Sequence, residues 1–169
     1  MFFQGLVSSR SSNAPNTAAS LNSPPGERKL QELFPARYEK IAGAVGWKGI
    51  HPGSLNLDVT RPPYEEVWSL KPAYQEPGDS VPYPAPYGPI PLERKEYRYY
   101  AGLLLRDDKC VEVLFRRPLI ASTGLSSHNI WRFDVFAEVS LRLALGIDDK
   151  NVVRCITEDW SGSFPVVNA

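Results

Sequence analysis

The sequence has no surplus of charge of either sign, because 19 Lys and Arg side chains balance 19 Asp and Glu side chains in 169 residues. Proteins that bind nucleic acid or an anionic membrane surface usually carry a marked surplus of basic residues. We therefore expect no nucleic-acid partner and no membrane partner, and an anionic ligand would have to be held by a local site. The oligomeric state is left open.

Cysteine and long apolar runs are also scarce. Cys110 and Cys155 lie in apolar stretches without the paired spacing of a zinc site, so both are interpreted as buried, reduced thiols. No apolar run approaches the roughly 18 residues of a membrane span, and the first residues lack the basic and apolar regions of a secretory signal. We expect a cytoplasmic protein, with an organelle transit peptide as the alternative.

Acidic residues are absent from residues 1–26, which are rich in Ser, Asn, Ala and Pro. Such a composition buries too little apolar surface to offset the entropy of ordering the chain. We predict a disordered tail over residues 1–26, or the remnant of a cloned protease site at residues 3–5. A single domain over residues 27–160 follows, and residues 161–169 form a C-terminal arm.

Hydrophobic periodicity predicts the elements of this domain. Apolar residues recur at steps of three and four along residues 30–45, which predicts a short helical turn before Pro35 and a helix over about 36–44. A second short helix is predicted over residues 138–145, ending at Gly146. Alternating or apolar runs predict strands over residues 54–59, 97–105, 110–115, 130–137 and 152–157, with a hairpin joining the second and third.

Residues 60–97 are unusual because they contain nine of the 16 prolines, interleaved with aromatic residues. Proline disfavours a central strand, and the aromatic side chains supply apolar area that needs to be buried. We predict an ordered segment that covers the barrel or sheet. A lid over a ligand is the sharper version of this prediction, and a Pro-rich segment offered to a partner domain ranks below both.

A rigid corner, His51-Pro52-Gly53, precedes the first predicted strand. Proline fixes one backbone angle and glycine permits a positive one, so the next side chains leave the corner in defined directions. Alternation then places Ser54 and Asn56 on one face of the strand. A hydroxyl and an amide oxygen at this spacing can ligate a hard cation such as Mg²⁺. The alternative is that both are turn residues that bond their own backbone.

Two further features carry polar groups. The segment 118–129 holds Thr123, Ser127 and His128, which can bind a phosphate or a hydroxylated ligand, although a solvated loop has the same composition. Asp134 lies between apolar residues in a predicted strand. Its carboxylate is either paired with Arg132 or another base, or it faces a pocket and accepts hydrogen bonds from a ligand.

Residues 38–59 and 98–157 resemble the archaeal CTP-dependent riboflavin kinases. The run Pro-Gly-Ser-Leu-Asn-Leu at 52–57 is similar to that family's Pro-Gly-Thr-Leu-Asn-Val signature. Further matches follow in the family's order: Arg117-Pro118, the loop with Thr123 and His128, the strand acid Asp134, Leu141-Arg142 and Leu145-Gly146-Ile147. The family's amino-terminal strand and Gly-rich segment have no evident counterpart upstream of Tyr38.

The resemblance implies a mainly β fold: a small six-stranded β-barrel of the cradle-loop type, with one or two short helices and residues 60–97 as a cover. It also implies a transferase activity. Members of the family transfer the terminal phosphate of CTP to the primary hydroxyl of riboflavin, giving FMN and CDP. Mg²⁺ is then the expected cofactor and a nucleotide the co-substrate.

The resemblance also implies roles for individual residues. Ser54 and Asn56 correspond to the metal site, and Gly53 and Ser54 lie beside the nucleotide. Asp134 takes the place of a glutamate that faces the flavin, and is the expected catalytic and substrate-binding acid. Thr123 and Ser127 are expected at the substrate, together with His128 as a second catalytic residue.

Two other functions stay open at this point. The first is a barrel that kept the scaffold without kinase activity and binds a small ligand or a protein partner. The second is an enzyme of different chemistry in the same pocket, with Asp134 and His128 as acid and base.

Overall fold

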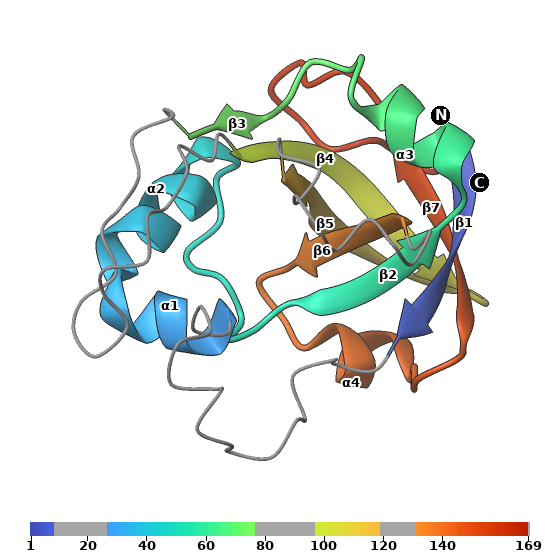
Figure 1. The fold of residues 1–169 in the computed structure, drawn as a ribbon, viewed down its shortest axis with the longest axis horizontal. Coiled ribbons are helices and arrows are strands. Elements are labelled where there is room, and N and C mark those ends of the chain that lie inside the picture. The colour runs from blue at the N-terminus through green and yellow to red at the C-terminus, as the bar shows by residue number, and fades with distance from the viewer. Residues whose placement is uncertain (9–26, 77–96, 119–130, 169) are drawn as a thin grey trace.

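A computed structural model describes residues 1–8, 27–76, 97–118 and 131–168 (Figure 1). The described part of the chain is mainly β. Six strands form a closed barrel, and a two-residue strand, β3 (Tyr74–Gln75), pairs with the edge of one of them. The barrel strands are β1 (Phe2–Ser8), β2 (Leu55–Val59), β4 (Tyr97–Arg106), β5 (Lys109–Pro118), β6 (Trp131–Phe136) and β7 (Val152–Thr157).

All strand pairs are antiparallel. The barrel strands follow the order β4-β5-β6-β2-β1-β7, and β7 pairs back with β4 to close the sheet. Closure removes the exposed sheet edges that favour aggregation. The predicted mainly β, six-stranded barrel is therefore confirmed and is compatible with the cradle-loop type. The predicted hairpin is confirmed too, since β4 and β5 pair in continuous register down to Arg106 and Lys109.

The amino-terminal segment corrects one prediction. Residues 1–26 were expected to form a disordered tail or a cloning remnant, but Phe2–Ser8 forms strand β1 between β2 and β7. Phe3 and Val7 point into the barrel and are buried, whereas Phe2 and Leu6 point outward. Composition did not predict this strand because the apolar alternation occupies only seven residues before a long polar stretch. Residues 9–26 lie outside the described part of the chain.

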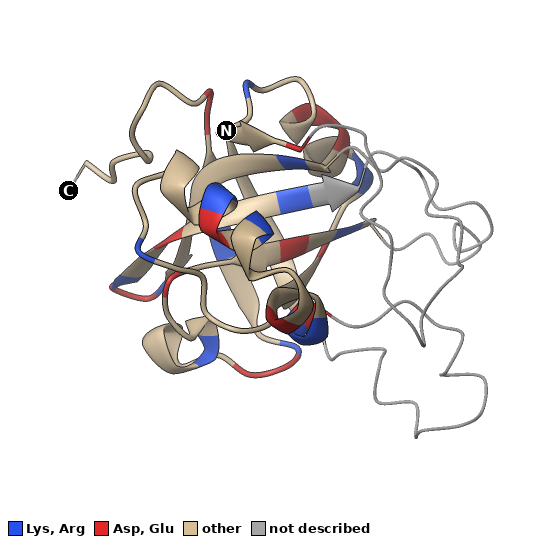
Figure 2. Cartoon of the chain, turned by 90° about the vertical axis from the view of Figure 1, so that its left-hand side faces the viewer, with Lys and Arg blue, Asp and Glu red and all other residues tan. Residues whose placement is uncertain are grey.

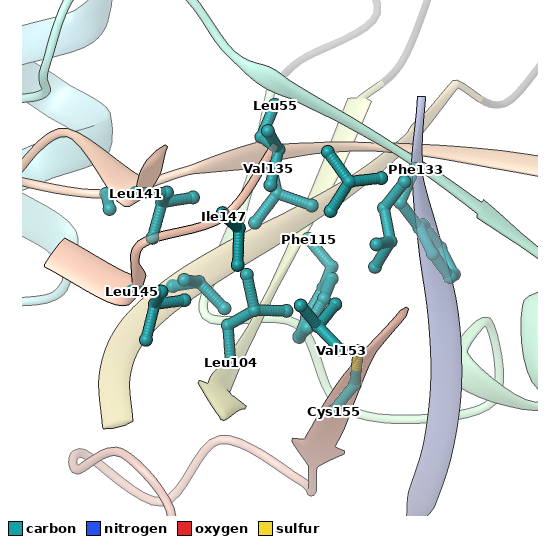
Figure 3. Close-up of a cluster of buried hydrophobic side chains, with 14 of the residues drawn as sticks. Leu55, Leu104, Phe115, Phe133, Val135, Leu141, Leu145, Ile147, Val153 and Cys155 are labelled. Carbon is teal, nitrogen blue, oxygen red and sulfur yellow. The ribbon is translucent and has the colours of Figure 1, made fainter. Parts of the chain in front are cut away.

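The barrel interior holds the main hydrophobic core (Figure 3). Leu55 and Leu57 on β2 point inward and meet Phe133 and Val135 on β6, as the alternation predicts. Cys155 on β7 is buried in the same core, which confirms its interpretation as a small hydrophobe. The interpretation of Cys110 is wrong, because this residue is exposed near the β4–β5 turn.

A second apolar cluster lies outside the barrel wall. The helices α1 (Glu27–Leu33) and α2 (Pro35–Ala44) lie side by side on one side of the barrel (Figure 1). Tyr38 and Ile41 of α2 pack against Leu114 and Phe136, which point outward from β5 and β6. The buried Phe164 of the predicted C-terminal arm joins this cluster. The predicted helix pair separated at Pro35 is confirmed.

Two shorter helices cover other parts of the barrel. Helix α4 (Leu141–Leu145) confirms the predicted short helix and ends at Gly146. Helix α3 (Arg61–Val67) begins the Pro-rich segment, and its Tyr64 packs against the rings of Trp131 and Phe133. Prolines in the first turn of a helix cost no hydrogen bond, which explains why they start α3 instead of disrupting it. The lid and partner-docking interpretations fall mainly on residues 77–96, outside the described residues.

Charges on the helical side of the molecule are mixed, and Figure 2 shows basic and acidic residues interspersed there. In the ranges that the structure describes, no helix is long and apolar enough to cross a bilayer.

Candidate functional site

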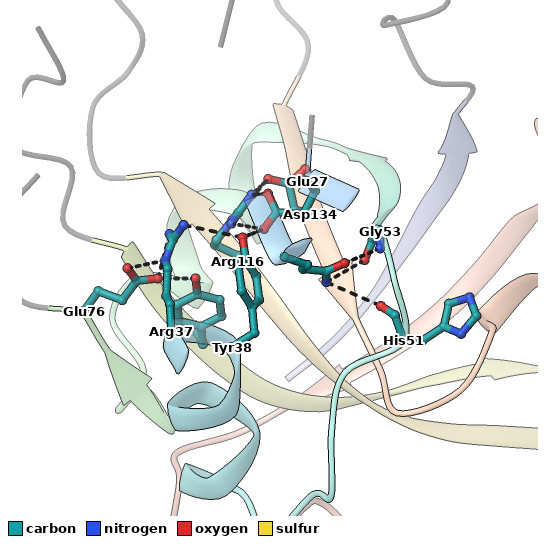
Figure 4. Close-up of polar contacts among 10 residues, drawn as sticks. Glu27, Arg37, Tyr38, His51, Gly53, Glu76, Arg116 and Asp134 are labelled. Atoms are coloured by element: carbon teal, nitrogen blue, oxygen red, sulfur yellow. Dashed lines mark hydrogen bonds and ion pairs between the residues drawn. The ribbon is translucent and has the colours of Figure 1, made fainter. Parts of the chain in front are cut away.

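The Pro-Gly corner is held in place by Gln31, which reaches it from α1. The backbone N–H of Gly53 donates to Gln31 Oε1 at 2.6 Å, and Gln31 Nε2 donates to the carbonyl oxygens of His51 and Gly53 at 3.5 Å each (Figure 4). Gly53 has a φ of 91°, a conformation that glycine adopts without strain. His51 N also donates to Ala137 O at 2.8 Å, so the corner is fixed from both sides.

This arrangement leaves the side chains after the corner uncommitted. Within the described part of the chain, neither the Ser54 hydroxyl nor the Asn56 amide makes a hydrogen bond. The alternative expectation, in which both side chains bond their own backbone, therefore does not describe this corner. Gln31 holds the turn through its hydrogen bonds. The side-chain oxygens of Ser54 and Asn56 can therefore contact solvent or a ligand.

Asn56 and Asp134 face each other directly across β2 and β6. Their Cα atoms are register partners, flanked by the inward pairs Leu55–Val135 and Leu57–Phe133. Both polar side chains therefore lie on the outer face of the barrel. Directly opposed side chains have Cβ atoms about 4.5–5.5 Å apart. The structure thus brings together the predicted amide and carboxylate from positions 78 residues apart in the sequence.

Ser54 lines a small cavity next to the Pro-Gly corner. A cavity of about 90 Å³ is lined by His51, Gly53 and Ser54, together with Ser140 and Arg142 from the start of α4. Ligand pockets for drug-sized molecules usually measure roughly 300–1,000 Å³. This hollow can hold a small group such as a phosphate, but not a flavin ring. Neither Asn56 nor Asp134 lines it.

Asp134 is paired with Arg116 and not with Arg132. Arg116 Nη2 and Nε donate to Asp134 Oδ2 at 2.6 and 3.2 Å, whereas Arg132 Nε pairs with Asp58 Oδ1 at 2.7 Å. Strand register explains the choice, because Arg116 is the direct partner of Asp134 and Arg132 is that of Asp58. The sequence predicted that Asp134 pairs with Arg132 or another base, and the partner is the other base, Arg116.

Arg116 also binds a second carboxylate, which comes from α1. Its Nη1 and Nη2 donate to the two oxygens of Glu27 at 3.1 and 2.8 Å, and the Tyr38 hydroxyl donates to the same carboxylate (Figure 4). The guanidinium lies over the rings of Tyr97 and Phe136 at 4.8 Å each. Such stacking suits arginine because its planar cation is weakly hydrated.

The network continues along α2. Arg37 makes two contacts with Glu76, at 2.8 and 2.9 Å, and its Nη1 donates to the Tyr38 hydroxyl at 3.4 Å. The hydroxyl of Tyr99 donates to Glu76 as well. A continuous chain of polar contacts therefore connects the residue after β3 with α2, α1, β5 and β6.

Burial and charge shift the titration of these groups. Burial alone would raise the pKa of Glu27, but the nearby Arg116 charge, with hydrogen bonds from Arg116 and Tyr38, lowers it below its ordinary value. Burial alone would lower the pKa of Arg116. The nearby carboxylates of Glu27 and Asp134 have the larger effect and raise this pKa above its ordinary value. Burial and a neighbouring carboxylate raise the pKa of Tyr38 and Tyr99, so both hydroxyls stay protonated donors.

The lowered pKa of Glu27 predicts a pH-dependent stability. The stabilisation is fully present above the ordinary value of 4.5 and is lost as the pH falls through the lower folded-state value. We expect Glu27→Gln to remove this part of the acid sensitivity. Urea unfolding between pH 7 and pH 3 measures it, with Glu32→Gln as the control because the pair that Glu32 forms with Lys29 is exposed. Parallel pH profiles of wild type and Glu27→Gln would contradict the assignment.

Three predicted site residues, Thr123, Ser127 and His128, lie outside the described residues. The backbone N–H of Gly53, predicted to lie at the nucleotide, is engaged by Gln31. Among residues 1–8, 27–76, 97–118 and 131–168, no group of three or more His, Cys, Asp or Glu side chains is arranged to hold a metal. A cation on this face would therefore rely on Ser54 or Asn56 oxygens and on groups of its ligand.

Sequence reasoning missed Glu27, Arg37, Glu76 and Arg116. One signal was present: Arg116 lies in β5 two residues after Leu114, so it points to the same outer side of the barrel wall, where Leu114 packs in the second apolar cluster. An arginine at such a position needs a carboxylate. The identity of that carboxylate depends on how strands and helices meet in space, which no local pattern indicates.

Comparison with known proteins adds no family. No protein-family model matches this chain, and no curated protein matches it either.

Proposed function

We propose that this protein is a riboflavin-kinase-like, magnesium-dependent phosphotransferase. It transfers a phosphate from a nucleotide, CTP in the family that the sequence resembles, to riboflavin or a similar hydroxylated small molecule. The observation that carries the proposal is the direct pairing of Asn56 with Asp134 on the outer face of the barrel, beside a corner that leaves the Asn56 amide uncommitted.

The donor chemistry of the corner fits a magnesium ion. Mg²⁺ prefers hard oxygen ligands, keeps several waters and is commonly bound by one or two protein groups together with substrate phosphates. The Asn56 amide oxygen and the Ser54 hydroxyl are such donors, and neither is hydrogen-bonded within the described residues. When bound, the metal neutralises charge on the transferred phosphate.

Asp134 is suited to hold the hydroxyl that accepts the phosphate. Both contacts from Arg116 fall on Oδ2, so Oδ1 remains to accept a hydrogen bond from a substrate hydroxyl. Arg116 fixes the orientation of this carboxylate, and positioning is the main requirement of phosphoryl transfer. His128, Thr123 and Ser127 are proposed to complete the substrate side, with His128 as a further proton acceptor.

A second candidate function is ligand binding without phosphoryl transfer, to a small molecule or a protein partner. It is favoured by the ion pairs of Arg116 with Asp134 and with Glu27, which stabilise the fold whether or not chemistry occurs. An enzyme that uses Asp134 and His128 as acid and base would share the same face.

Thermal unfolding with CTP, ATP, riboflavin and FMN, each with and without Mg²⁺, tests the proposal. We expect nucleotide stabilisation that requires Mg²⁺, because a ligand at about 100 times its Kd stabilises by about 2.7 kcal/mol. Asn56→Ala is expected to abolish this shift, and Asn168→Ala, at an exposed position near the C-terminus, to leave it unchanged. A shift that persists in Asn56→Ala rules out the metal assignment. Stabilisation by flavin alone favours the binding protein.

A further inference from the structure

Two side chains of helix α1, Glu27 and Gln31, accept hydrogen bonds from groups of the candidate site. The carboxylate of Glu27 receives Nη1 and Nη2 of Arg116 and the hydroxyl of Tyr38. One turn further along the same helix, Oε1 of Gln31 receives the N–H of Gly53. Figure 4 shows both contacts on the same side of the barrel, with Asp134 beside Arg116. Three N–H donors and one O–H donor are thus occupied by a single helix.

The attachment of α1 to the barrel is mostly polar. No apolar residue of α1 is fully buried, and of its described apolar side chains only Leu30 packs at the margin of the second apolar cluster, whereas the enclosed side chain is the charged Glu27. By contrast, α2 buries Tyr38, Ile41 and Ala42 against the barrel wall. Apolar burial is the main force that holds a short helix in place. Displacement of α1 therefore sacrifices little buried apolar surface, and Pro35 separates it from α2.

Glu27 is also a surplus charge in this network. Arg116 is already neutralised by Asp134, and Arg37 by Glu76, so Glu27 brings a third carboxylate to two guanidinium groups. Burial of this third carboxylate carries a desolvation cost, which its contacts with Arg116 and Tyr38 outweigh. Its donors have the geometry that binds the paired oxygens of a carboxylate or a phosphate.

We propose that Glu27 is an internal ligand: it occupies an oxyanion site formed by Arg116 and Tyr38, and an anionic ligand takes this site by displacing α1. The displacement also frees the N–H of Gly53 from Gln31. The inference builds on the proposed function by naming where an anionic group of the ligand sits, and its test uses neither nucleotide nor metal.

Binding of inorganic phosphate to the full chain tests the inference, measured by calorimetry at constant ionic strength. Removal of an internal competitor raises the apparent affinity of an external ligand. We expect Glu27→Ala to bind phosphate at least tenfold more tightly than wild type. Glu32→Ala is the matched control, since Glu32 lies on the same helix in an exposed ion pair, and we expect it to bind as wild type does. A parallel titration with acetate distinguishes a carboxylate ligand from a phosphate ligand.

Amide hydrogen exchange of the wild type supplies the second readout. Saturating phosphate is expected to speed exchange in residues 27–33 at least tenfold and to leave α2 protected. If Glu27→Ala does not fold, Glu27→Gln keeps the side-chain size and removes the charge, with the same expectation. The inference is overturned if the folded variants bind phosphate no more tightly than wild type, or if phosphate leaves α1 protection unchanged. Phosphate binding combined with failure of the Asn56 test leaves an oxyanion site without phosphoryl transfer.

Discussion

Deletion of residues 1–8 is expected to unfold the barrel at 25 °C. These residues contain β1, which lies between β2 and β7 in the barrel and pairs with both. Without it, two strand edges are exposed and the core opens to water. If the segment were a tail or a cloning remnant, its removal would have no effect, so the deletion separates the two interpretations.

The expected loss is comparable with the whole stability of a domain. Phe3 and Val7 are buried, and each such side chain contributes about 1.5–3 kcal/mol. The ring of Phe3 also contacts those of Phe115 and Phe133 at 5.6 and 6.0 Å. Each hydrogen bond of the two strand pairings adds about 0.5–1.5 kcal/mol. The sum is on the order of 10 kcal/mol, against a typical total of about 5–15 kcal/mol.

Circular dichroism and guanidinium unfolding measure this effect. The control is the double substitution Phe2→Ser and Leu6→Ser, which changes only side chains on the outer face of β1. We expect the control to unfold cooperatively and the deletion to show no cooperative transition. A truncated chain with a wild-type unfolding midpoint would show that β1 does not belong to the folded barrel.

The substitution Gly102→Ala is expected to cost more than about 3 kcal/mol, beyond the usual range for overpacking. A Cβ at this position of β4 would lie 2.3 Å from the carbonyl oxygen of Ile156 and 2.6 Å from the ring of Phe115. The first neighbour is backbone in the strand that closes the barrel, so it cannot move without disturbing the β4–β7 pairing. The effect should appear as a large drop in the guanidinium midpoint.

Gly43→Ala is the matched control for this prediction. A Cβ there meets nothing within 4 Å, and the position is inside α2, where alanine is favoured over glycine by about 1 kcal/mol. We expect a small gain in stability. The double variant Gly102→Ala, Phe115→Leu should recover only part of the loss, because the clash with the Ile156 carbonyl remains. Full recovery would show that the ring alone sets the constraint.

Local pattern was sufficient to predict most of the barrel. Alternation in β2 and β7, and the polar turn between β4 and β5, are properties of neighbouring residues. The one missed barrel strand, β1, has Gly5 at its centre, where a side chain would meet Leu57 at 2.4 Å. Glycine weakens the strand signal, although close packing requires it here.

The candidate site was predicted only in part, for a reason of register. The sequence placed Asn56 on the polar face of its strand, but the face-to-face position of Asp134 depends on how β2 and β6 align. The choice of Arg116 over Arg132 as partner depends on the alignment of β5 and β6 in the same way. The contribution of Glu27 depends on where α1 settles, and helix docking has no local signature.

Formation of FMN by the full chain tests the central proposal most directly. Riboflavin is incubated with CTP or ATP and Mg²⁺, and the flavins are separated by chromatography. We predict that FMN accumulates with wild type and with Asn168→Ala, and at least 100-fold more slowly with Asn56→Ala, a loss equivalent to about 2.7 kcal/mol of transition-state stabilisation. Absence of FMN from a folded wild-type protein with either nucleotide would contradict the proposed kinase activity.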